Sequence, residues 1–338
     1  MMKIPERENS TVNLIDDYYS NKTDNHRPHM GASLIGHKCE RFLWYSFRWA
    51  FKEQFSGRML RLFDVGHDFE TKVIRDLRNV GVDIRSSQDR VNFCKHVSGS
   101  VDGIIYSGLV EAPKSKHVAE FKTHSDKSFN LLIKDGVEKS KPLHYIQMQT
   151  YMLGLEIDRA FYLAINKNTS ELYSERLELN KEVAKKAVER AQRIAMQESK
   201  PHPISFDSTW YECSYCPAKE ICHKDAPTKQ VNCRTCAHST PKEDSTWFCE
   251  RWKDTIPYED QLTGCPSHVF HPEMVPYEFK PYAKDDWHAI YIINKIPVIN
   301  GPDGFLSTEI VANPEACANP DSFVSELRNT MGGRRITG

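Results

Sequence analysis

The chain has 338 residues, with 45 Lys and Arg against 46 Asp and Glu, so its formal net charge at pH 7 is −1. Hydrophobic residues make up 39% of the sequence, which is enough for a folded core and excludes global disorder. No apolar run reaches the ~18 residues of a membrane span, and the polar N-terminus lacks the apolar stretch of a secretory signal. We therefore expect a soluble, cytoplasmic protein with one large domain and one or two small ones.

Hydrophobic periodicity and turn residues predict the elements in chain order. Residues 1–28 are polar and predict a flexible N-terminal arm. Apolar residues at helical spacing predict helices over 33–50, 66–80, 143–157 and 181–198. Short runs rich in β-branched or aromatic residues predict strands over 91–97, 100–106, 117–122, 160–166 and 171–179. Together these elements indicate an α/β fold.

An acidic and lysine-containing pattern lies in the strand-rich part of the chain. Asp102 and Glu120 sit within short apolar runs, where an unpaired carboxylate costs free energy. Two hard oxygen ligands aimed at one point suit Mg²⁺ or Mn²⁺. Glu120 and Lys122 are two residues apart, so on a strand they point the same way. This arrangement fits phosphodiester hydrolysis, in which the metal activates water and the lysine orients or deprotonates it. The alternative is a structural Glu120–Lys122 pair on an exposed strand.

The order of the motifs resembles the RecB-like branch of the PD-(D/E)XK nuclease superfamily, which includes lambda-type phage exonucleases and the iron–sulfur nucleases of CRISPR adaptation. That branch carries a His or Glu on a helix, then an Asp after a hairpin turn, then ExK, then a helix with Q-x-x-x-Y. This chain supplies, in that order, Gly66-His67 with Glu70, Asp102, Glu120-Phe121-Lys122 and Gln147 to Tyr151. The resemblance covers residues 31–226 and implies a restriction-endonuclease-like core, a mixed sheet flanked by helices.

The resemblance also implies a role for each matched residue. The metal ligands would be His67, Asp102, Glu120 and the carbonyl of Phe121, and Lys122 would be the catalytic lysine. Gln147 and Tyr151, one helical turn apart, would contact DNA or support Lys122. Two alternatives stay open at this point, because Glu70 can replace His67 and Gln149 competes with Gln147.

Ten cysteines in a chain without a secretory signal point to metal binding rather than disulfides. Cys213, Cys216 and Cys222 offer three soft ligands, one fewer than a four-ligand site needs. In the iron–sulfur members of the resembled family, one cysteine before the nuclease core joins three after it to hold a 4Fe–4S cluster. Cys39 matches that position. Zn²⁺ at the same four thiolates is the alternative.

A second group of cysteines follows directly. The spacing Cys233-x2-Cys236-x12-Cys249-x15-Cys265 is typical of a zinc module. Cys265 is the least certain ligand, and the residues that can replace one cysteine are His238, His268 and His271. Cys94 and Cys317 are expected to be ordinary thiols.

These observations predict four regions: a flexible arm (1–28), a PD-(D/E)XK nuclease domain closed by an iron–sulfur cluster (29–226), a zinc module (227–275) and a C-terminal appendix (276–338). The expected activity is that of a Mg²⁺- or Mn²⁺-dependent DNA exonuclease in recombination, repair or replication, of phage or mobile-element type, in a bacterial cell or phage-infected host. The chain has no G-x-x-x-x-G-K-[ST] motif, so a helicase, like a single-strand annealing protein, would be a partner.

Two other functions remain open. One is a non-catalytic DNA-binding or scaffold protein that keeps the fold and the metal sites. The other is an RNA-directed nuclease, which ranks last because no RRM or KH signature is visible.

Overall fold

The computed structural model describes residues 10–22, 26–85 and 90–319. The chain divides into two compact units: the first comprises 1–37 and 53–192, and the second comprises 38–52 and 193–338. Parts of the predicted arm (1–9 and 23–25) and of the predicted appendix (320–338) lie outside the described residues. None of the described helices combines the length and the hydropathy that a membrane span requires.

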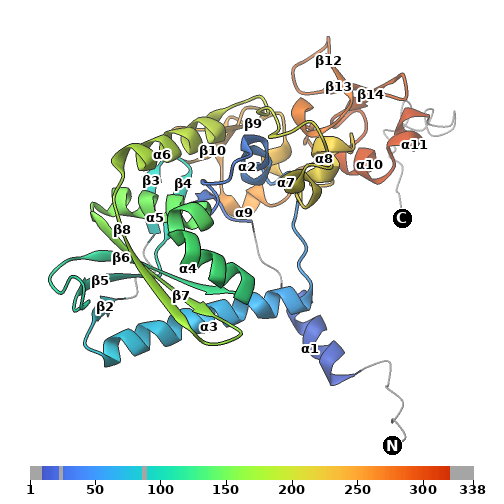
Figure 1. Ribbon diagram of the computed structural model, residues 1–338. Coiled ribbons are helices and arrows are strands. Elements are labelled where there is room, and N and C mark those ends of the chain that lie inside the picture. Colours follow the sequence, from blue (N-terminus) through green and yellow to red (C-terminus); the bar gives the residue numbers. More distant parts are fainter. Residues whose placement is uncertain (1–9, 23–25, 86–89, 320–338) are drawn as a thin grey trace, which may run out of the picture. The chain divides into compact units, whose positions relative to one another are not determined.

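The first unit contains a five-stranded mixed sheet with the strand order β2-β5-β6-β7-β8 (Figure 1). The strands are β2 (Asp83–Arg85), β5 (Gly103–Ser107), β6 (His117–His124), β7 (Arg159–Asn166) and β8 (Leu172–Glu178). Only β6 and β7 of this sheet pair in parallel. A parallel pair needs a long crossover connection, and helices α4 (Asp126–Ser140) and α5 (Pro142–Leu155) provide it.

Helices cover both faces of this sheet. Phe69 and Val73 of α3 (Gly57–Asn79) pack in one apolar cluster with Phe121 of β6. On the other face, α4 and α5 contribute Leu132 and Met148 to a second cluster. Alternate residues of β6 therefore serve different layers. Those beginning with Ala119 face α3, and the row that contains Glu120 faces α4 and α5.

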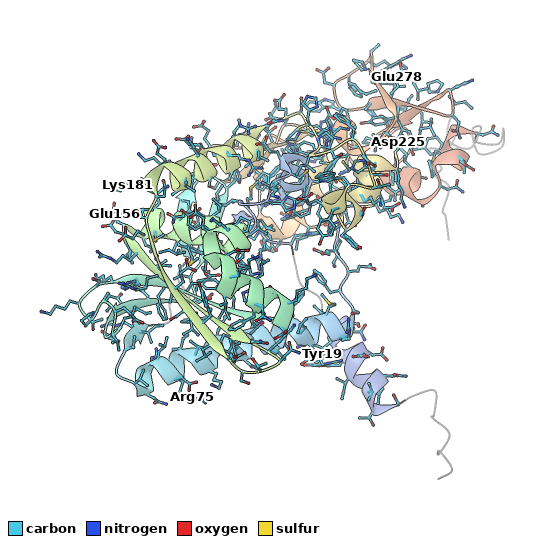
Figure 2. All side chains as sticks on the ribbon, in the orientation of Figure 1. Tyr19, Arg75, Glu156, Lys181, Asp225 and Glu278 are labelled. Carbon is cyan, nitrogen blue, oxygen red and sulfur yellow. The ribbon has the colours of Figure 1, made fainter. Side chains whose placement is uncertain are left out.

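Smaller elements complete the first unit: β1 (Met30–Gly31), β3 (Arg90–Cys94) and β4 (Val97–Ser100), which form a three-stranded sheet, and helix α1 (Thr11–Ser20). Helix α6 (Lys181–Met196) belongs to the first unit up to Gln192 and to the second from Arg193. Helix α1 lies against α3, because Asp16 pairs with Arg61 and Lys22 Nζ lies 3.4 Å from Asp64. The predicted flexible arm thus includes a docked helix. Figure 2 labels Tyr19 on α1 and Arg75 on α3.

The predicted helix over 33–50 is shorter than the sequence indicates. Helix α2 covers Glu40–Phe47, and residues 32–36 form turns instead. The amide of Leu34 donates to the carbonyl of Gly31, and that of His37 donates to Leu34, which closes two successive turns before the helix. Trp49, with φ of 52°, lies just beyond its end. The aromatic residues Trp44, Tyr45, Phe47 and Trp49 are nevertheless buried, whereas Phe42 is only half-buried.

The second unit has two small antiparallel sheets. One consists of β9 (Ser239–Pro241), β10 (Trp247–Cys249) and β11 (Asp254–Ile256), and the other of β12 (Glu278–Pro281), β13 (Ala289–Ile293) and β14 (Ile296–Asn300). Its helices are α2, α7 (Tyr211–Ser214), α8 (Lys219–His223), α9 (Tyr258–Gln261), α10 (Ser307–Ala312) and α11 (Pro314–Ala318), with 3₁₀ turns η1 (Cys233–Thr235) and η2 (Pro272–Met274).

A buried arginine organises the centre of this unit. The guanidinium of Arg234 lies 3.8 Å from the ring centroid of Trp49 and 4.8 Å from that of Trp247. It also donates to the carbonyl of Phe47 at 3.0 Å and to the side chain of Gln261 at 3.0 Å. Burial lowers the pKa of Arg234 to about 9, and aromatic faces and carbonyl oxygens replace the lost water.

The close packing of the first unit around Gly99 of β4 can be tested by substitution. A Cβ added there would lie 2.4 Å from the Tyr151 hydroxyl and 2.9 Å from the Ala32 Cβ. We predict that Gly99→Ala lowers the free energy of unfolding by about 1–3 kcal/mol, because side chains must move to accept the methyl group. The matched control is Gly66→Ala in α3, where nothing lies within 4 Å of the added atom. It should raise stability by up to about 1 kcal/mol. Urea unfolding measures both, and equal stabilities for the two variants would contradict the described packing.

Candidate active site and cysteine clusters

Strands β5 and β6 bring the acidic and lysine residues together. Gly103 pairs with Ala119, and continuing this register by one residue places Asp102 opposite Glu120. Lys122 Nζ lies 2.5 Å from Glu120 Oε1 and 3.7 Å from Asp102 Oδ2. The Phe121 amide donates to Asp102 Oδ2 at 2.8 Å, and the Phe121 carbonyl accepts from Lys122 Nζ at 3.0 Å. The three side chains and this carbonyl therefore share one small region.

The carboxylate of Glu120 is completely buried. Beyond the ion pair with Lys122, neither of its oxygens accepts a hydrogen bond from a described residue. Burial raises the pKa of Glu120 against the opposing charge of Lys122, and Asp102 raises it further. Burial acts to lower the pKa of Lys122, but Glu120 and Asp102 hold it well above its ordinary value. The site thus has more negative than positive charge, and a bound cation would compensate it.

Helix α3 adds a further carboxylate to this region. Glu70 is half-buried, and its pKa is raised by burial and then by Asp102, while Lys122 and His67 lower it. Glu70 in turn raises the pKa of Glu120. His67 lies three residues earlier on α3 and is exposed. Of the two candidates on this helix, the electrostatic coupling favours Glu70 as the residue that faces the cluster.

Helix α5 places Gln147 and Tyr151 beside the same region, both buried. The Tyr151 hydroxyl donates to the Ser100 carbonyl at 2.6 Å, which fixes the backbone two residues before Asp102. Burial raises the pKa of Tyr151, followed by the charges of Glu120 and Asp102, while a hydrogen bond with Gln147 lowers it. The Tyr151 hydroxyl therefore lies beside the segment that leads into Asp102.

The competing glutamine has a different environment. Gln149 Nε2 donates to the Glu178 carbonyl at 2.9 Å, and its Oε1 accepts from the Asn180 amide at 2.7 Å. Both ends of this side chain therefore hold the backbone that follows β8. Gln149 is a structural residue, and Gln147 is the glutamine that accompanies Tyr151.

Three residues beside the site were not identified from the sequence. Tyr162 of β7 pairs with Glu120 in the parallel register. Its hydroxyl lies 2.8 Å from His124 Nε2 and 3.0 Å from His144 Nδ1. Two periodicities could have revealed the histidines. His124 lies four residues after Glu120 on one strand face, and His144 lies three residues before Gln147 on one helix face.

The oxygen atoms of this cluster suit Mg²⁺ or Mn²⁺. Asp102, Glu120 and the Phe121 carbonyl supply hard ligands. Apart from its ion pair with Lys122, the buried Glu120 carboxylate accepts no hydrogen bond from a described residue, and a bound cation would compensate for this. Among the described residues, no group of three or more His, Cys, Asp or Glu side chains has a metal-binding arrangement. Two carboxylates with a carbonyl still match Mg²⁺, because that ion usually keeps several of its waters.

The first set of cysteines gathers within the second unit. Cys39 is the residue before α2, and Cys213 lies in α7. The pKa of Cys216 is raised to about 11, mainly by burial and further by Cys39, Cys222 and Cys213. Arg41 Nη1 lies 3.7 Å from Cys222 Sγ. The four thiols, separated by up to 183 positions in the sequence, thus belong to one unit, but the described residues do not draw three or more of them into a metal-binding arrangement.

The second set lines one cavity of about 430 Å³. Burial raises the pKa of Cys233, and Cys236, Cys265 and Cys249 raise it further. Burial also raises the pKa of Cys236, while backbone amides of Val269 and His238 donate to its sulfur and oppose that rise. No disulfide occurs among the described cysteines. The η1 turn, strand β10 and the loop after α9 therefore bring these four thiols to one cavity.

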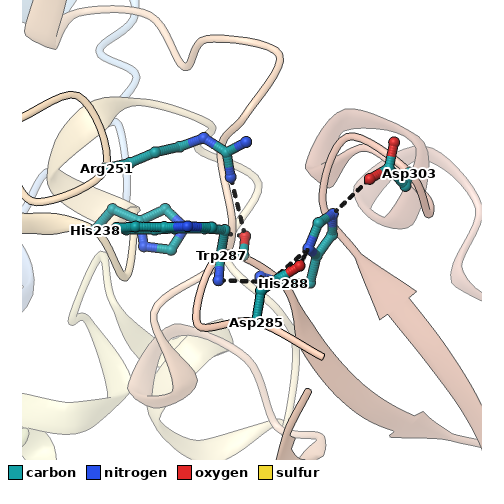
Figure 3. Close-up of polar contacts among 6 residues, drawn as sticks. All are labelled: His238, Arg251, Asp285, Trp287, His288 and Asp303. Carbon is teal, nitrogen blue, oxygen red and sulfur yellow. Dashed lines mark hydrogen bonds and ion pairs between the residues drawn. The ribbon is translucent and has the colours of Figure 1, made fainter. Parts of the chain in front are cut away.

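The histidines near this cavity are engaged elsewhere. His238 Nε2 lies 3.2 Å from the Trp287 carbonyl, within the loop that Asp285 and His288 stabilise (Figure 3). His268 contacts Ser307 Oγ at 2.7 Å through Nδ1 and the Asn232 carbonyl at 3.1 Å through Nε2. His271 Nδ1 accepts from the Glu273 amide. His268 thus uses both ring nitrogens, whereas His238 and His271 each use one in these contacts, so Cys265, His238 and His271 are all candidates for the fourth ligand.

Comparison with known proteins adds a family. A family model described as the PD-(D/E)XK nuclease superfamily matches residues 5–223. No curated protein matches the chain. One similar solved structure is the crystal structure of SSO0001, with 16% identity and a TM-score of 0.38 over 62% of this chain and 93% of the other. Another is an alkaline exonuclease from Laribacter hongkongensis, with 15% identity and a TM-score of 0.35 over 50% of this chain and 87% of the other.

Proposed function

Because the chain belongs to the PD-(D/E)XK nuclease superfamily, we propose that it is a metal-dependent deoxyribonuclease whose active site is formed by Asp102, Glu120 and Lys122. The observation that carries this proposal is their convergence, with Lys122 Nζ 2.5 Å and 3.7 Å from the two carboxylates. A lysine and two carboxylates at one point form the constellation that phosphodiester hydrolysis needs. The proposed substrate is DNA, attacked from its ends as in the exonucleases that the motif order resembles.

In this proposal, Asp102, Glu120 and the Phe121 carbonyl hold Mg²⁺ or Mn²⁺, the ions that nucleases of this superfamily generally use. Glu70, or His67 in its place, contributes from α3. When bound, the ion polarises the scissile phosphate and lowers the pKa of water. Lys122, held beside the two carboxylates, would orient the attacking water or take a proton from it, and would stabilise phosphate charge.

The residues of α5 support this arrangement. The Tyr151 hydroxyl holds the Ser100 carbonyl, and through it the segment that carries Asp102. Gln147, one helical turn before Tyr151 and also buried, would support Tyr151 or contact DNA. We assign Tyr151 a positioning role, because its hydroxyl is already bonded to the backbone. A helicase or a single-strand annealing protein as partner, and a setting in phage or mobile-element recombination, belong to this proposal and rest on the resemblance alone.

Cleavage assays test the active site. We predict that Asp102→Ala, Glu120→Ala and Lys122→Ala each slow cleavage of linear DNA by at least about 100-fold in Mg²⁺ or Mn²⁺, because several kcal/mol of transition-state stabilisation are lost. The control is Lys127→Ala, an exposed lysine of α4, which should cleave at the wild-type rate. End-labelled linear DNA and closed circular DNA are compared, and an enzyme that acts from ends digests only the linear form.

Two outcomes would overturn parts of the proposal. Wild-type rates for all three variants would show that the active site lies elsewhere. Wild-type protein that binds DNA but leaves it intact with both ions would establish the alternative, a non-catalytic DNA-binding protein that retains the fold.

We further propose that Cys39, Cys213, Cys216 and Cys222 hold a 4Fe–4S cluster. Support comes from the mutual charge effects of these four thiols in the second unit and from the matching pattern of one early and three late cysteines. Thiolate ligands must deprotonate and draw together to bind metal, so binding would be coupled to folding of this segment. Zn²⁺ at the same thiols remains the alternative ligand.

The metal content distinguishes these ligands. We predict that protein purified without oxygen is brown and contains about four iron atoms per chain, because one 4Fe–4S cluster contains four iron atoms and each is held by one thiolate. Cys216→Ser should be colourless, whereas Cys94→Ser, which alters a thiol outside both sets, should keep its iron. Colourless wild-type protein with two zinc ions per chain would favour the zinc alternative.

For the second set, we propose a structural Zn²⁺ held by Cys233, Cys236, Cys249 and Cys265. The shared cavity and the amide donors to Cys236 support this proposal, since such donors stabilise the thiolate that zinc requires. A module of this kind serves either as a clamp for DNA or a partner, or as a purely structural element.

Proteolysis tests this zinc site. We predict that Cys233→Ser loses one zinc ion per chain and exposes residues 227–275 to protease, because metal binding contributes directly to folding. Cys317→Ser, in which a buried thiol far along the chain is altered, is the control for mere loss of a sulfur atom. Unchanged zinc content in Cys233→Ser would contradict the proposed ligand set.

A further inference from the structure

A chain of hydrogen bonds runs from Lys141 to His144 beside the proposed active site. Lys141 Nζ lies 2.9 Å from Ser128 Oγ, which lies 3.3 Å from His124 Nδ1. His124 Nε2 lies 2.8 Å from the Tyr162 hydroxyl, and that hydroxyl lies 3.0 Å from His144 Nδ1. The two imidazoles and the phenol are stacked, with interplanar angles of 25–29°.

The direction of this chain is fixed at its first member. A lysine ammonium only donates hydrogen bonds, so Ser128 Oγ accepts from Lys141 and its own proton is directed to His124 Nδ1. Burial lowers the pKa of His124 to about 4, with further lowering by Lys141 and Lys122. A neutral His124 that accepts at Nδ1 carries its proton on Nε2, and therefore donates to the Tyr162 oxygen.

The same reasoning continues to the end of the chain. Since the Tyr162 oxygen accepts from His124, its proton is directed to His144 Nδ1. Burial lowers the pKa of His144 to about 3, and Lys122, His124 and Lys141 lower it further. His144 is thus neutral, with its proton on Nε2. Among the described residues, no hydrogen-bond partner lies at that nitrogen, and the residue is only partly buried.

The surroundings of His144 favour an anionic acceptor. The charges that act on it come from Lys122 and Lys141, and both lower its pKa. His144 also lies one turn before Gln147 on α5, on the face that carries Tyr151. We propose that His144 Nε2 donates a hydrogen bond to a phosphate oxygen of the DNA strand bound at this site, with Tyr162 and His124 as the positioning residues that fix its donor tautomer.

This inference rests on the proposed nuclease function and names a substrate contact that the acidic motif does not include. Loss of a hydrogen bond to a charged group corresponds to a change of about 10- to 100-fold in affinity. We therefore expect His144→Ala to raise KM for a linear duplex oligonucleotide, and its Kd in EDTA, by about that factor, with kcat within about threefold of wild type. Tyr162→Phe, which removes only the orienting hydroxyl, should raise both by about 3- to 10-fold.

Two further variants separate a substrate contact from a structural role. In His144→Gln, the amide places a donor near the position of Nε2, so KM should return toward the wild-type value. Tyr173→Phe is the matched control, because this tyrosine of β8 bonds Glu175 at 2.6 Å and takes no part in the chain. It should leave KM and Kd unchanged. Thermal unfolding of all four variants checks that each is folded.

The outcomes distinguish this inference from the function on which it rests. Unchanged KM and Kd in His144→Ala and Tyr162→Phe would overturn it, and so would a fall in kcat and thermal stability that His144→Gln does not rescue. Wild-type protein that neither binds nor cleaves DNA would instead overturn the proposed function.

Discussion

The structure of the first unit depends on a group of charges that surrounds one completely buried carboxylate, that of Glu120. Glu120 is completely buried in a strand whose neighbours are apolar, and its carboxylate is balanced by one lysine and opposed by Asp102 and Glu70. Such an arrangement is costly in the folded protein, because desolvated carboxylates repel one another and lack hydrogen-bond donors. The sheet and the helices around it hold these groups in place, so a cation could bind to them without a further cost for ordering its ligands.

The two faces of β6 show how one strand combines packing with chemistry. Ala119 and Phe121 belong to the apolar layer under α3, while Glu120 and Lys122 face α4 and α5. The side-chain period of two keeps these functions apart, and a slip of one residue in register would exchange them. The parallel pairing with β7 adds Tyr162 directly beside Glu120. The Tyr162 hydroxyl in turn contacts His124, which lies on the same strand as Glu120, and His144 of α5.

Much of the fold follows from local patterns in the sequence. The predicted helix over 66–80 is the C-terminal part of α3, and the strands predicted over 160–166 and 171–179 match β7 and β8 closely. Predicted strand boundaries were wrong where a turn contains no glycine or proline. The predicted strand over 91–97 is divided at His96, which adopts φ of 60°. Side-chain periodicity continues across such a turn, so the sequence does not mark it.

The candidate site was predictable only in part, for a physical reason. Asp102, Glu120 and Lys122 belong to a local motif, and adjacent strands bring them together. The choice between His67 and Glu70 depends on how α3 is rotated against the sheet. That rotation is set by the packing of Phe69 against sheet residues that are distant in the sequence, such as Phe121. The choice between Gln147 and Gln149 likewise depends on contacts with residues that are distant in the sequence. Only the position of the chain after β8 shows that Gln149 is engaged by the backbone.

The second unit is formed by two separate stretches of the sequence, and the first cysteine set has members in both. In the sequence, residues 38–52 and 193–338 are separated by residues 53–192, which include the five-stranded sheet of the first unit. A cross-link between Cys39 and Cys213 would close a loop of more than 170 residues, and by the estimate used for disulfides it would remove about 5 kcal/mol of chain entropy from the unfolded state. A metal cluster at these thiols would act in the same sense. Arg234, which bonds the Phe47 carbonyl and packs on Trp49, already joins the same two segments without a metal. Loss of the cluster should therefore loosen the segment around α7 and α8 first, and leave the arginine-centred core of the unit in place.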